Sequence, residues 1–220
     1  MSSYSQLFGY FPYKINTSKK IIALTFDDGP NEPYTSDLLD FLLSKNVKVT
    51  FFLVGKNIQK HPKTLDRIIN EGHIIGNHSY SHEFKNYFKS FRFKNEILRN
   101  QATIKKITGL TPLFYRSPWL FRTPFILKTL KNNNLTPVSG IFCHPLEVLR
   151  INPLKIANRA IKSSSPGRII IFHDGIEGRG GNRENTIKAA KLFINDLLEK
   201  GYEFQTIDKL FNLPAYRSSN

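Results

Sequence analysis

The sequence predicts a single-domain α/β protein built around a parallel β-sheet, and three observations support this prediction. The length of 220 residues suits one domain with a sizeable hydrophobic core. Short apolar runs alternate with longer segments of helical periodicity about six or seven times along the chain. Proline, asparagine and glycine residues mark the expected ends of several helices. Regular strand–helix alternation is typical of either a barrel or a doubly wound sheet.

The expected strands are short runs rich in β-branched and aromatic residues, as in buried strands. They cover residues 21–26, 48–54, 73–76, 113–116, 136–139 and 168–172, with 202–207 as a further strand. The loops expected at residues 79–92 and 175–185 each follow a strand. In parallel α/β folds, functional sites are built at that end of the strands.

The segments between these strands show helical spacing and helix start signals. Leu38, Leu42 and Leu43 share one face of the first expected helix. Residues 65, 68 and 69 do the same in the next one. Prolines stand where first helical turns begin, at Pro33, Pro62, Pro124 and Pro153. Stop signals follow the first two helices at Asn46 and Gly72, and residues 185–200 form the last long helix.

Composition limits the classes of function. Hydrophobic residues make up 40% of the chain and charged residues 22%, which is ordinary for a globular protein, and no run approaches the roughly 18 apolar residues of a membrane span. Cys143 is the only cysteine, so an intrachain disulfide and a cysteine-based zinc site are excluded. The net charge of +15 is expected either to attract polyanions, such as cell-wall polymers, lipid head groups or nucleic acid, or to form no more than a lysine-rich solvated surface. The scattered basic residues form no nucleic-acid recognition motif.

The ends of the chain are expected to lie outside the domain, with residues 1–19 as a lead-in, 20–212 as the domain and 213–220 as a tail. The lead-in has no continuous apolar segment of the kind found in secretory signals. The compartment therefore stays open between the cytoplasm and, for a trimmed or otherwise exported chain, the cell envelope or exterior.

Two motifs at strand ends indicate a metal site. Asp27 and Asp28 close the first strand, and a bound cation would allow both neighbouring carboxylates to stay ionised. His78 and His82 follow the third strand, four residues apart, a spacing that suits one metal ion. Each motif taken alone also fits a simple turn or a pair of surface histidines. Together they offer one carboxylate and two imidazoles, which suits zinc, with cobalt, nickel or iron as alternatives.

Two further strands end in residues suited to catalysis. Arg116 follows the fourth strand and can keep a neighbouring carboxylate ionised. His173 ends the most apolar strand, where a histidine can titrate near neutral pH and donate a proton. The alternatives are a surface ion pair for Arg116 and a core histidine for His173. Asp, His, Arg and His at one end of a sheet are typical of metal-assisted hydrolysis.

These motifs resemble those of the polysaccharide deacetylases with a NodB-homology domain, carbohydrate esterase family 4. The matching strings are TFDDGP at residues 25–30, HSYSH at 78–82, RSP at 116–118 and IFH at 171–173. Their order and spacing cover roughly residues 20–210. The resemblance implies a distorted (β/α) barrel of about seven parallel strands.

The resemblance also implies a role for each matching residue. Asp27 is expected to be the general base, Arg116 to tether it, His173 to be the general acid, and the Trp119 backbone N–H to help stabilise the oxyanion. The metal ligands are expected to be Asp28, His78 and His82. The substrate groove is expected to include Pro118, Phe142 and Ile171.

Two departures from the family pattern stand out. Family members usually carry an aromatic–glycine pair after the third motif, whereas Leu120 follows Trp119 here. An Asp-Trp pair that tunes the acid histidine is usual before the last strand, and residues 138–146 contain neither residue. Either Phe142 or His144 is expected to line the groove instead.

The implied function is metal-dependent removal of N-acetyl groups from amino-sugar glycans, either chitin oligomers or peptidoglycan, by a metal-activated water. One alternative on the same scaffold is a deacetylase or deformylase of a small N-acyl sugar or sugar-lipid. A catalytically silent carbohydrate-binding protein is the alternative from another class. Acetate release with added zinc or cobalt separates these.

Overall fold

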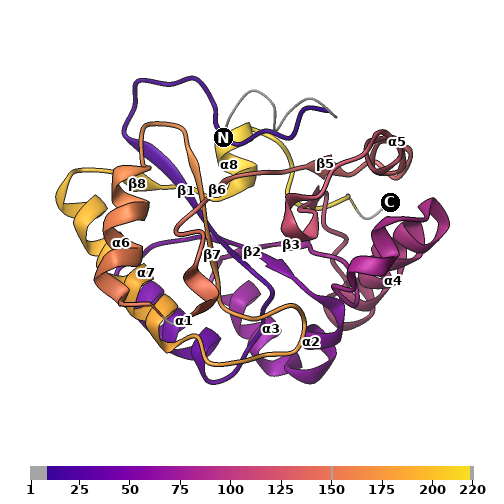
Figure 1. Ribbon diagram of the computed structural model, residues 1–220, viewed down its shortest axis with the longest axis horizontal. Helices are drawn as coiled ribbons and strands as arrows, with labels where there is room; N and C mark the ends of the chain where they lie inside the picture. The colour runs from indigo at the N-terminus through magenta and orange to yellow at the C-terminus, as the bar shows by residue number, and fades with distance from the viewer. Residues whose placement is uncertain (1–8, 150, 219–220) are drawn as a thin grey trace.

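The computed structural model describes residues 9–149 and 151–218 and shows one α/β domain with a parallel sheet at its centre (Figure 1). Seven strands form one curled path in the order β5-β4-β3-β2-β1-β7-β6, and β8 pairs with β1 beside it. Every paired strand is parallel to its neighbour. The curled sheet confirms the predicted distorted barrel, and β5 and β6 are the two ends of the path.

The strands are short, and several are shorter than the sequence predicted. They are β1 (Ile21–Asp27), β2 (Thr50–Leu53), β3 (Ile74–Asn77), β4 (Phe114–Tyr115), β5 (Thr136–Pro137), β6 (Ile141–Phe142), β7 (Ile169–His173) and β8 (Glu203–Phe204). The two-residue strand β6 was not expected. A strand of that length has too few residues to show the alternation on which a sequence-based assignment depends.

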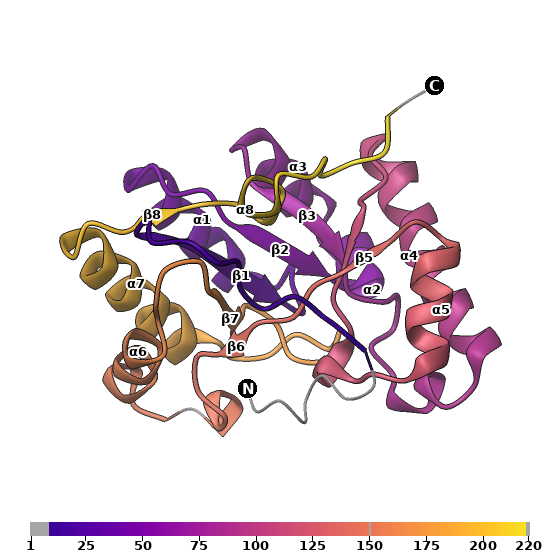
Figure 2. The same cartoon turned by 90° about the horizontal axis from the view of Figure 1, so that it is seen from above.

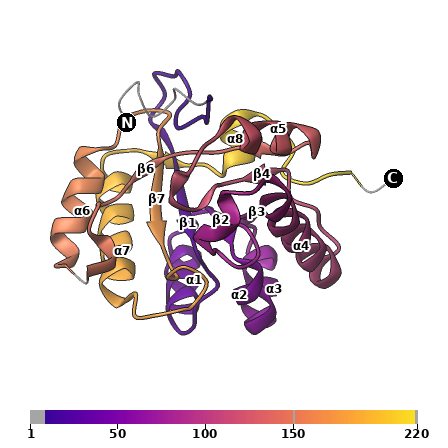
Figure 3. The same ribbon diagram turned by 45° about the vertical axis from the view of Figure 1, so that its right-hand side comes forward.

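Helices surround the sheet and connect its strands (Figures 1 and 2). The longer ones are α1 (Tyr34–Ser44), α3 (Pro62–Asn70), α4 (Ser90–Thr108), α5 (Pro124–Asn132), α6 (Pro153–Lys162) and α7 (Glu184–Glu199). Shorter helical segments are α2 (Gly55–Lys60), η2 (Phe84–Tyr87), η3 (Pro118–Leu120), η4 (Glu147–Leu149) and α8 (Ile207–Phe211). Helices α6 and α7 lie side by side along one flank, with α4 on the opposite flank (Figure 3).

The predicted helix signals act where they were expected. Pro62, Pro124 and Pro153 occupy first-turn positions of their helices, and Pro33 is the residue before α1. The fixed φ of proline suits the first turn, where a missing N–H costs no helical hydrogen bond. Asn46 and Gly72 both take left-handed φ angles just beyond α1 and α3, as a stop signal requires.

The core has an outer and an inner layer because side chains alternate along β1. Leu24 and Phe26 belong to the layer that packs against the surrounding helices, whereas Ala23 belongs to the layer inside the curl. Ile207 and Leu210 of α8 close the inner layer. The domain is therefore filled on both faces of the sheet, which leaves the carboxyl ends of the strands to form a site. Every helix within the described residues is too short or too polar to cross a bilayer.

The described parts of the lead-in and tail are hydrogen-bonded to the sheet region. In the lead-in, Phe11 is fully buried and the Ile15 amide donates to the Gly167 carbonyl at 2.9 Å. In the tail, the Leu113 amide donates to the Ala215 carbonyl at 2.9 Å, and the Ile75 amide donates to the Tyr216 hydroxyl at 3.1 Å. Residues 1–8 of the expected lead-in and 219–220 of the expected tail lie outside the described residues.

Candidate active site

The two neighbouring aspartates at the end of β1 face different partners. Asp27 is the last residue of the strand and is aligned with His173 at the end of β7. Asp28 follows with a φ of 77°, a left-handed conformation that aspartate tolerates better than most residues. The turn directs the Asp27 carboxylate to Arg116 and the Asp28 carboxylate to two histidines. The two adjacent carboxylates therefore have separate partners, a guanidinium for Asp27 and two imidazoles for Asp28.

Asp28, His78 and His82 form a buried triad. The Asp28 Oδ1 atom lies 3.3 Å from His78 Nε2 and 3.1 Å from His82 Nε2. Each residue is at most 6% exposed, and within the described residues this is the group whose ligand atoms converge as a metal site requires. Zinc–ligand bonds of about 2.0–2.2 Å in a tetrahedron hold ligand atoms roughly 3.3–3.6 Å apart. The separation from His78 lies in this range, and the separation from His82 is slightly shorter.

The hydrogen bond on the far side of His78 fixes which nitrogen is available. His78 Nδ1 lies 2.8 Å from the Arg116 carbonyl, which only accepts, so Nδ1 carries the proton. In the neutral imidazole, Nε2 then presents a lone pair toward the Asp28 carboxylate. Oδ1 of Asp28 has no hydrogen-bond donor within the described residues. Lone pairs that face one another in a buried site call for a cation, so the donor set fits a divalent metal ion.

The charge state of Asp28 supports the same conclusion. Burial by itself raises the pKa of this carboxyl, but the charge of His82 and the N–H groups that His78 and His82 can direct at it in the absence of a metal outweigh burial and hold the pKa well below its usual range. The second oxygen, Oδ2, accepts a hydrogen bond of 3.0 Å from the Glu177 amide. Asp28 is therefore an oriented carboxylate anion with one oxygen left for a ligand.

Arg116 forms a buried ion pair with Asp27. Its Nη1 atom donates to Asp27 Oδ1 and to Thr25 Oγ1, both at 2.6 Å, and Nη2 donates to the Ser139 carbonyl at 3.1 Å. The guanidinium is fully buried and lies 4.1 Å from the centre of the Phe52 ring. A charge-assisted bond of this kind stabilises the ionised form of Asp27 and fixes its orientation. The structure thus brings Arg116 to the carboxylate that the sequence analysis assigned to it.

His173 is held by Glu147, a residue that the sequence analysis did not select. His173 Nδ1 lies 2.9 Å from Glu147 Oε2, and the His173 amide donates to Oε1 at 3.0 Å. Burial by itself lowers the pKa of His173, but the charge and hydrogen bond of Glu147, with smaller contributions from Asp28 and Asp27, raise it to about 9. The sequence analysis expected titration near neutral pH; this structure places it higher. A divalent cation beside Asp28 would lower the pKa in part, since like charges repel.

Glu147 supplies the carboxylate that the family pattern places as aspartate before the last strand. It lies on the 3₁₀ turn η4, beyond the residues 138–146 in which neither expected residue was found. Burial raises the pKa of Glu147, yet the charge of His173 and its hydrogen bond lower it below the usual range. Because this residue is a glutamate and lies beyond residue 146, an Asp-Trp pattern does not identify it.

One cavity of about 450 Å³ is lined by the buried triad together with Asp27, Glu147 and His173. Trp119 forms part of one wall, with its ring edge-on to His82 at 4.4 Å. Phe142 also lines the cavity and stacks on His173 with ring centres 5.8 Å apart. His144 also lines the cavity, so both residues that were considered for the groove are found there. The cavity is therefore flanked by an aromatic side chain on the metal side and another on the acid side.

Two expected groove residues lie elsewhere. Pro118 and Ile171 are buried and are not among the residues that line the cavity. Ile171 alternates with Ile170 along β7 and faces the same side as Ile169, inside the curl of the sheet. Both residues shape the backbone and core behind the site instead of forming its surface.

The backbone at Trp119 and Leu120 is held in the left-handed region, at a φ of 53° for each residue. Non-glycine residues pay about 1 kcal/mol or more for this conformation, and such residues cluster at functional sites. Glycine, usual after the aromatic residue in the resembling family, would adopt it without strain. The leucine at this departure from the family pattern therefore takes a conformation that glycine would adopt without strain.

Comparisons with known proteins agree with this geometry. A family model described as polysaccharide deacetylase matches residues 14–138, more than half of the chain. The chain belongs to the polysaccharide deacetylase family. It is accordingly a hydrolase of the polysaccharide N-deacetylase type, which acts on carbon–nitrogen bonds of amides.

Individual relatives of this deacetylase cover almost the whole chain. A peptidoglycan-N-acetylglucosamine deacetylase of Bacillus cereus is 30% identical over 203 residues, covering 92% of this chain and 93% of the relative. The peptidoglycan-N-acetylmuramic acid deacetylase PdaC of Bacillus subtilis is also 30% identical, over 93% of this chain and 42% of the relative. Among solved structures, the Bc1960 peptidoglycan N-acetylglucosamine deacetylase has a TM-score of 0.86 at 32% identity, covering 93% and 94% of the two chains.

Proposed function

We propose that this deacetylase removes acetyl groups from N-acetylglucosamine units of peptidoglycan with the help of a divalent metal ion, most simply zinc. The observation that carries the proposal is the single cavity in which a buried Asp-His-His triad faces a carboxylate-held histidine. Peptidoglycan is favoured over chitin as the substrate because the relatives that match most of the chain are named as peptidoglycan deacetylases.

Asp28, His78 and His82 would hold the metal. When bound, the cation supplies an electrophile that polarises the acetamide carbonyl and lowers the pKa of water. Three protein ligands leave coordination positions open for water and substrate, as catalytic sites require. The ligand types suit zinc, and cobalt, nickel or iron are compatible with the same imidazole and carboxylate set.

The proton transfers are assigned to the two groups on either side of the triad. Asp27 accepts the proton of the attacking water, because Arg116 keeps it ionised and fixed in place. The Trp119 backbone N–H donates to the developing oxyanion, an interaction of the kind that supplies about 3–4 kcal/mol. His173, held as imidazolium by Glu147, donates its Nε2 proton to the departing sugar amine. The products are acetate and a free amino sugar.

The acid role of His173 is supported by its hydrogen bond to Glu147 and by its raised pKa. Its imidazole is bound to Glu147 through Nδ1, so Nε2 is the nitrogen that remains to donate a proton. A raised pKa keeps His173 protonated near neutral pH, as a general acid must be before it acts. Asp27, by contrast, is paired with the Arg116 guanidinium and is suited to accept a proton.

Acetate release tests the proposal. Peptidoglycan fragments, chitin oligomers and small N-acyl sugars are incubated with zinc-loaded, cobalt-loaded and chelator-treated enzyme, and acetate is measured enzymatically. We expect release from peptidoglycan fragments that depends on the metal. Release only from small N-acyl sugars would favour the small-substrate alternative, and none from any N-acetylated glycan despite bound metal would favour a carbohydrate-binding protein.

The net charge of +15 supports one further part of the proposal, an association with anionic cell-envelope polymers. Binding of the intact protein to isolated cell walls is expected to weaken as salt rises from about 0.1 to 1 M, because the screening length falls from about 10 to 3 Å. Salt-independent binding would contradict this part and leave the enzymatic proposal intact.

A further inference from the structure

A second cavity of about 560 Å³ opens directly beside the catalytic one. The two share a boundary formed by His82 and Trp119 on one side and by Glu177 and Arg179 on the other. The second cavity continues past the metal triad onto η2. A ligand too long for the catalytic cavity would therefore extend naturally into this one.

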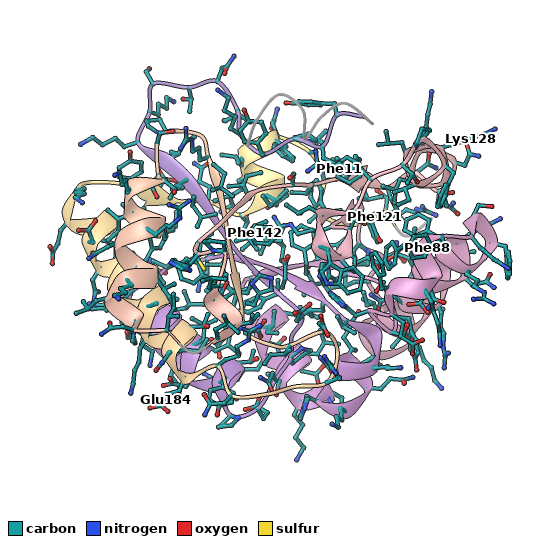
Figure 4. All side chains as sticks on the ribbon, in the orientation of Figure 1. Phe11, Phe88, Phe121, Lys128, Phe142 and Glu184 are labelled. Carbon is teal, nitrogen blue, oxygen red and sulfur yellow. The ribbon has the colours of Figure 1, made fainter. Side chains whose placement is uncertain are left out.

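An aromatic surface forms one wall of the second cavity. Phe84 is 49% exposed, yet its ring is fixed from behind by Trp119 at 5.1 Å, Phe88 at 4.9 Å and Phe121 at 5.7 Å. Phe88 and Phe121 lie together on this side of the molecule, away from Phe142 (Figure 4). A flat, rigid and exposed ring beside an active site suits the C–H face of a pyranose, which is apolar.

Charged side chains also line this cavity. Glu83 accepts hydrogen bonds from Lys56 at 3.2 Å and from Lys85 at 2.9 Å, and Arg179 is paired with Glu177. Three cations meet two anions, so the group carries one positive charge in excess. Each ammonium has three N–H donors, of which Glu83 accepts one from each lysine. The lysines therefore retain donors and charge for an anionic ligand.

We infer that the second cavity binds the sugar next to the one being deacetylated, and that this neighbouring sugar bears a carboxylate. The ring of that sugar packs on Phe84, and its carboxylate reaches Lys85 with Lys56 close by. This inference rests on the proposed function and extends it from the acetylated unit to its neighbour. In the alternating glycan of peptidoglycan the neighbour carries a lactyl ether with such a group, whereas every sugar of a chitin oligomer is neutral.

The test compares two tetrasaccharides of equal length. One is a peptide-free peptidoglycan fragment with free lactyl carboxylates, and the other is the neutral tetramer of N-acetylglucosamine. For each variant, the ratio of kcat/KM for the anionic to the neutral substrate is measured with zinc-loaded enzyme. Because both substrates use the same catalytic groups, the ratio is insensitive to small losses of active protein or of metal.

Lys85→Glu is expected to lower this ratio about five- to tenfold, because it replaces an attraction by a repulsion at an exposed site. Its matched control is Lys94→Glu, an equal charge change at an exposed position on α4 outside the cavity. Phe84→Ala is expected to raise KM for both tetrasaccharides about tenfold, with a smaller effect on kcat. Its control is Phe91→Ala, an exposed phenylalanine that does not line the cavity.

The outcomes separate the two proposals. If wild type and Lys85→Glu release acetate with the same ratio, the inference of a carboxylate-binding neighbour site is overturned while the proposed function stands. An unchanged KM in Phe84→Ala would likewise overturn the aromatic part. If the wild type releases acetate from neither tetrasaccharide, the proposed function itself fails.

Discussion

Replacing Glu147 by glutamine removes the negative charge beside His173 and keeps the size of the side chain. Burial by itself lowers the pKa of His173, and Glu147 is the main influence that raises it from 6.5 to about 9. That difference corresponds to roughly 3 kcal/mol, because one pKa unit is worth about 1.4 kcal/mol. In the variant the pKa of His173 is expected to fall below the ordinary value, because burial is then opposed only by Asp28 and Asp27.

The pH dependence of kcat/KM for acetate release measures this change. At about pH 7.5, a histidine of ordinary pKa is roughly 10% protonated, whereas one whose pKa is about 9 is almost fully protonated. Because the pKa in the variant is expected to lie below the ordinary value, the variant should be at least about tenfold slower. The alkaline limb of its profile should lie about two pH units or more below that of the wild type. A bound cation lowers both pKa values, and the gap in rate should narrow as the pH falls toward the pKa of His173 in the variant.

Glu147→Asp is the control because it keeps the charge, and its alkaline limb should stay within about one pH unit of the wild type. The reasoning is refuted if Glu147→Gln is slow by the same factor at every pH, since Glu147 would then act on geometry alone. It is also refuted if the alkaline limb of Glu147→Gln coincides with that of the wild type.

Three further predictions follow from the site. Asp27→Asn should bind zinc at wild-type stoichiometry in metal analysis but lose more than about 100-fold in kcat; turnover near wild type would remove Asp27 as the base. His82→Ala should lower zinc affinity more than about 100-fold and lose the gain of about 2.7 kcal/mol in unfolding free energy that zinc at 100 times its Kd provides; stoichiometric zinc would exclude His82 as a ligand. In the metal-free protein, the pKa of His173 is higher folded than unfolded, so its contribution of up to roughly 3 kcal/mol is complete below about pH 6.5 and is lost as pH rises through about 9. Denaturant titrations should therefore give wild type a larger advantage in unfolding free energy over Glu147→Gln at about pH 6 than at about pH 10. Equal unfolding free energies of the two proteins at about pH 6 would contradict this prediction.

The proximity of Asp28, His78 and His82 was predictable because these residues belong to local strings at strand ends. Parallel strands align their carboxyl ends, so identifying β1 and β3 was enough to bring Asp28 and His78 together. The same holds for Asp27 and His173, which are aligned neighbours on β1 and β7. The outline of the fold followed from the same alternation of strands and helices.

Glu147 and the second cavity were not predictable in this way. Glu147 meets His173 across 26 residues, from a 3₁₀ turn that no periodic pattern announces. Phe84 reads in the sequence as one aromatic residue in a polar loop, and only the packing of η2 against η3 turns it into an exposed wall. Contacts made by loops depend on tertiary packing, which the strand and helix periodicities do not encode.

The strand order divides the chemistry between the two sides of β1. His78 and His82, the proposed metal ligands beyond Asp28, follow β3, whereas His173 ends β7 and Glu147 follows β6, on the other side of β1 in the sheet. Asp27 and Asp28 lie between the two groups, at the end of β1. The residues proposed to bind the metal and the pair proposed to supply the acid are thus carried by separate stretches of chain. A substitution after β6 can therefore change the acid without replacing any proposed ligand.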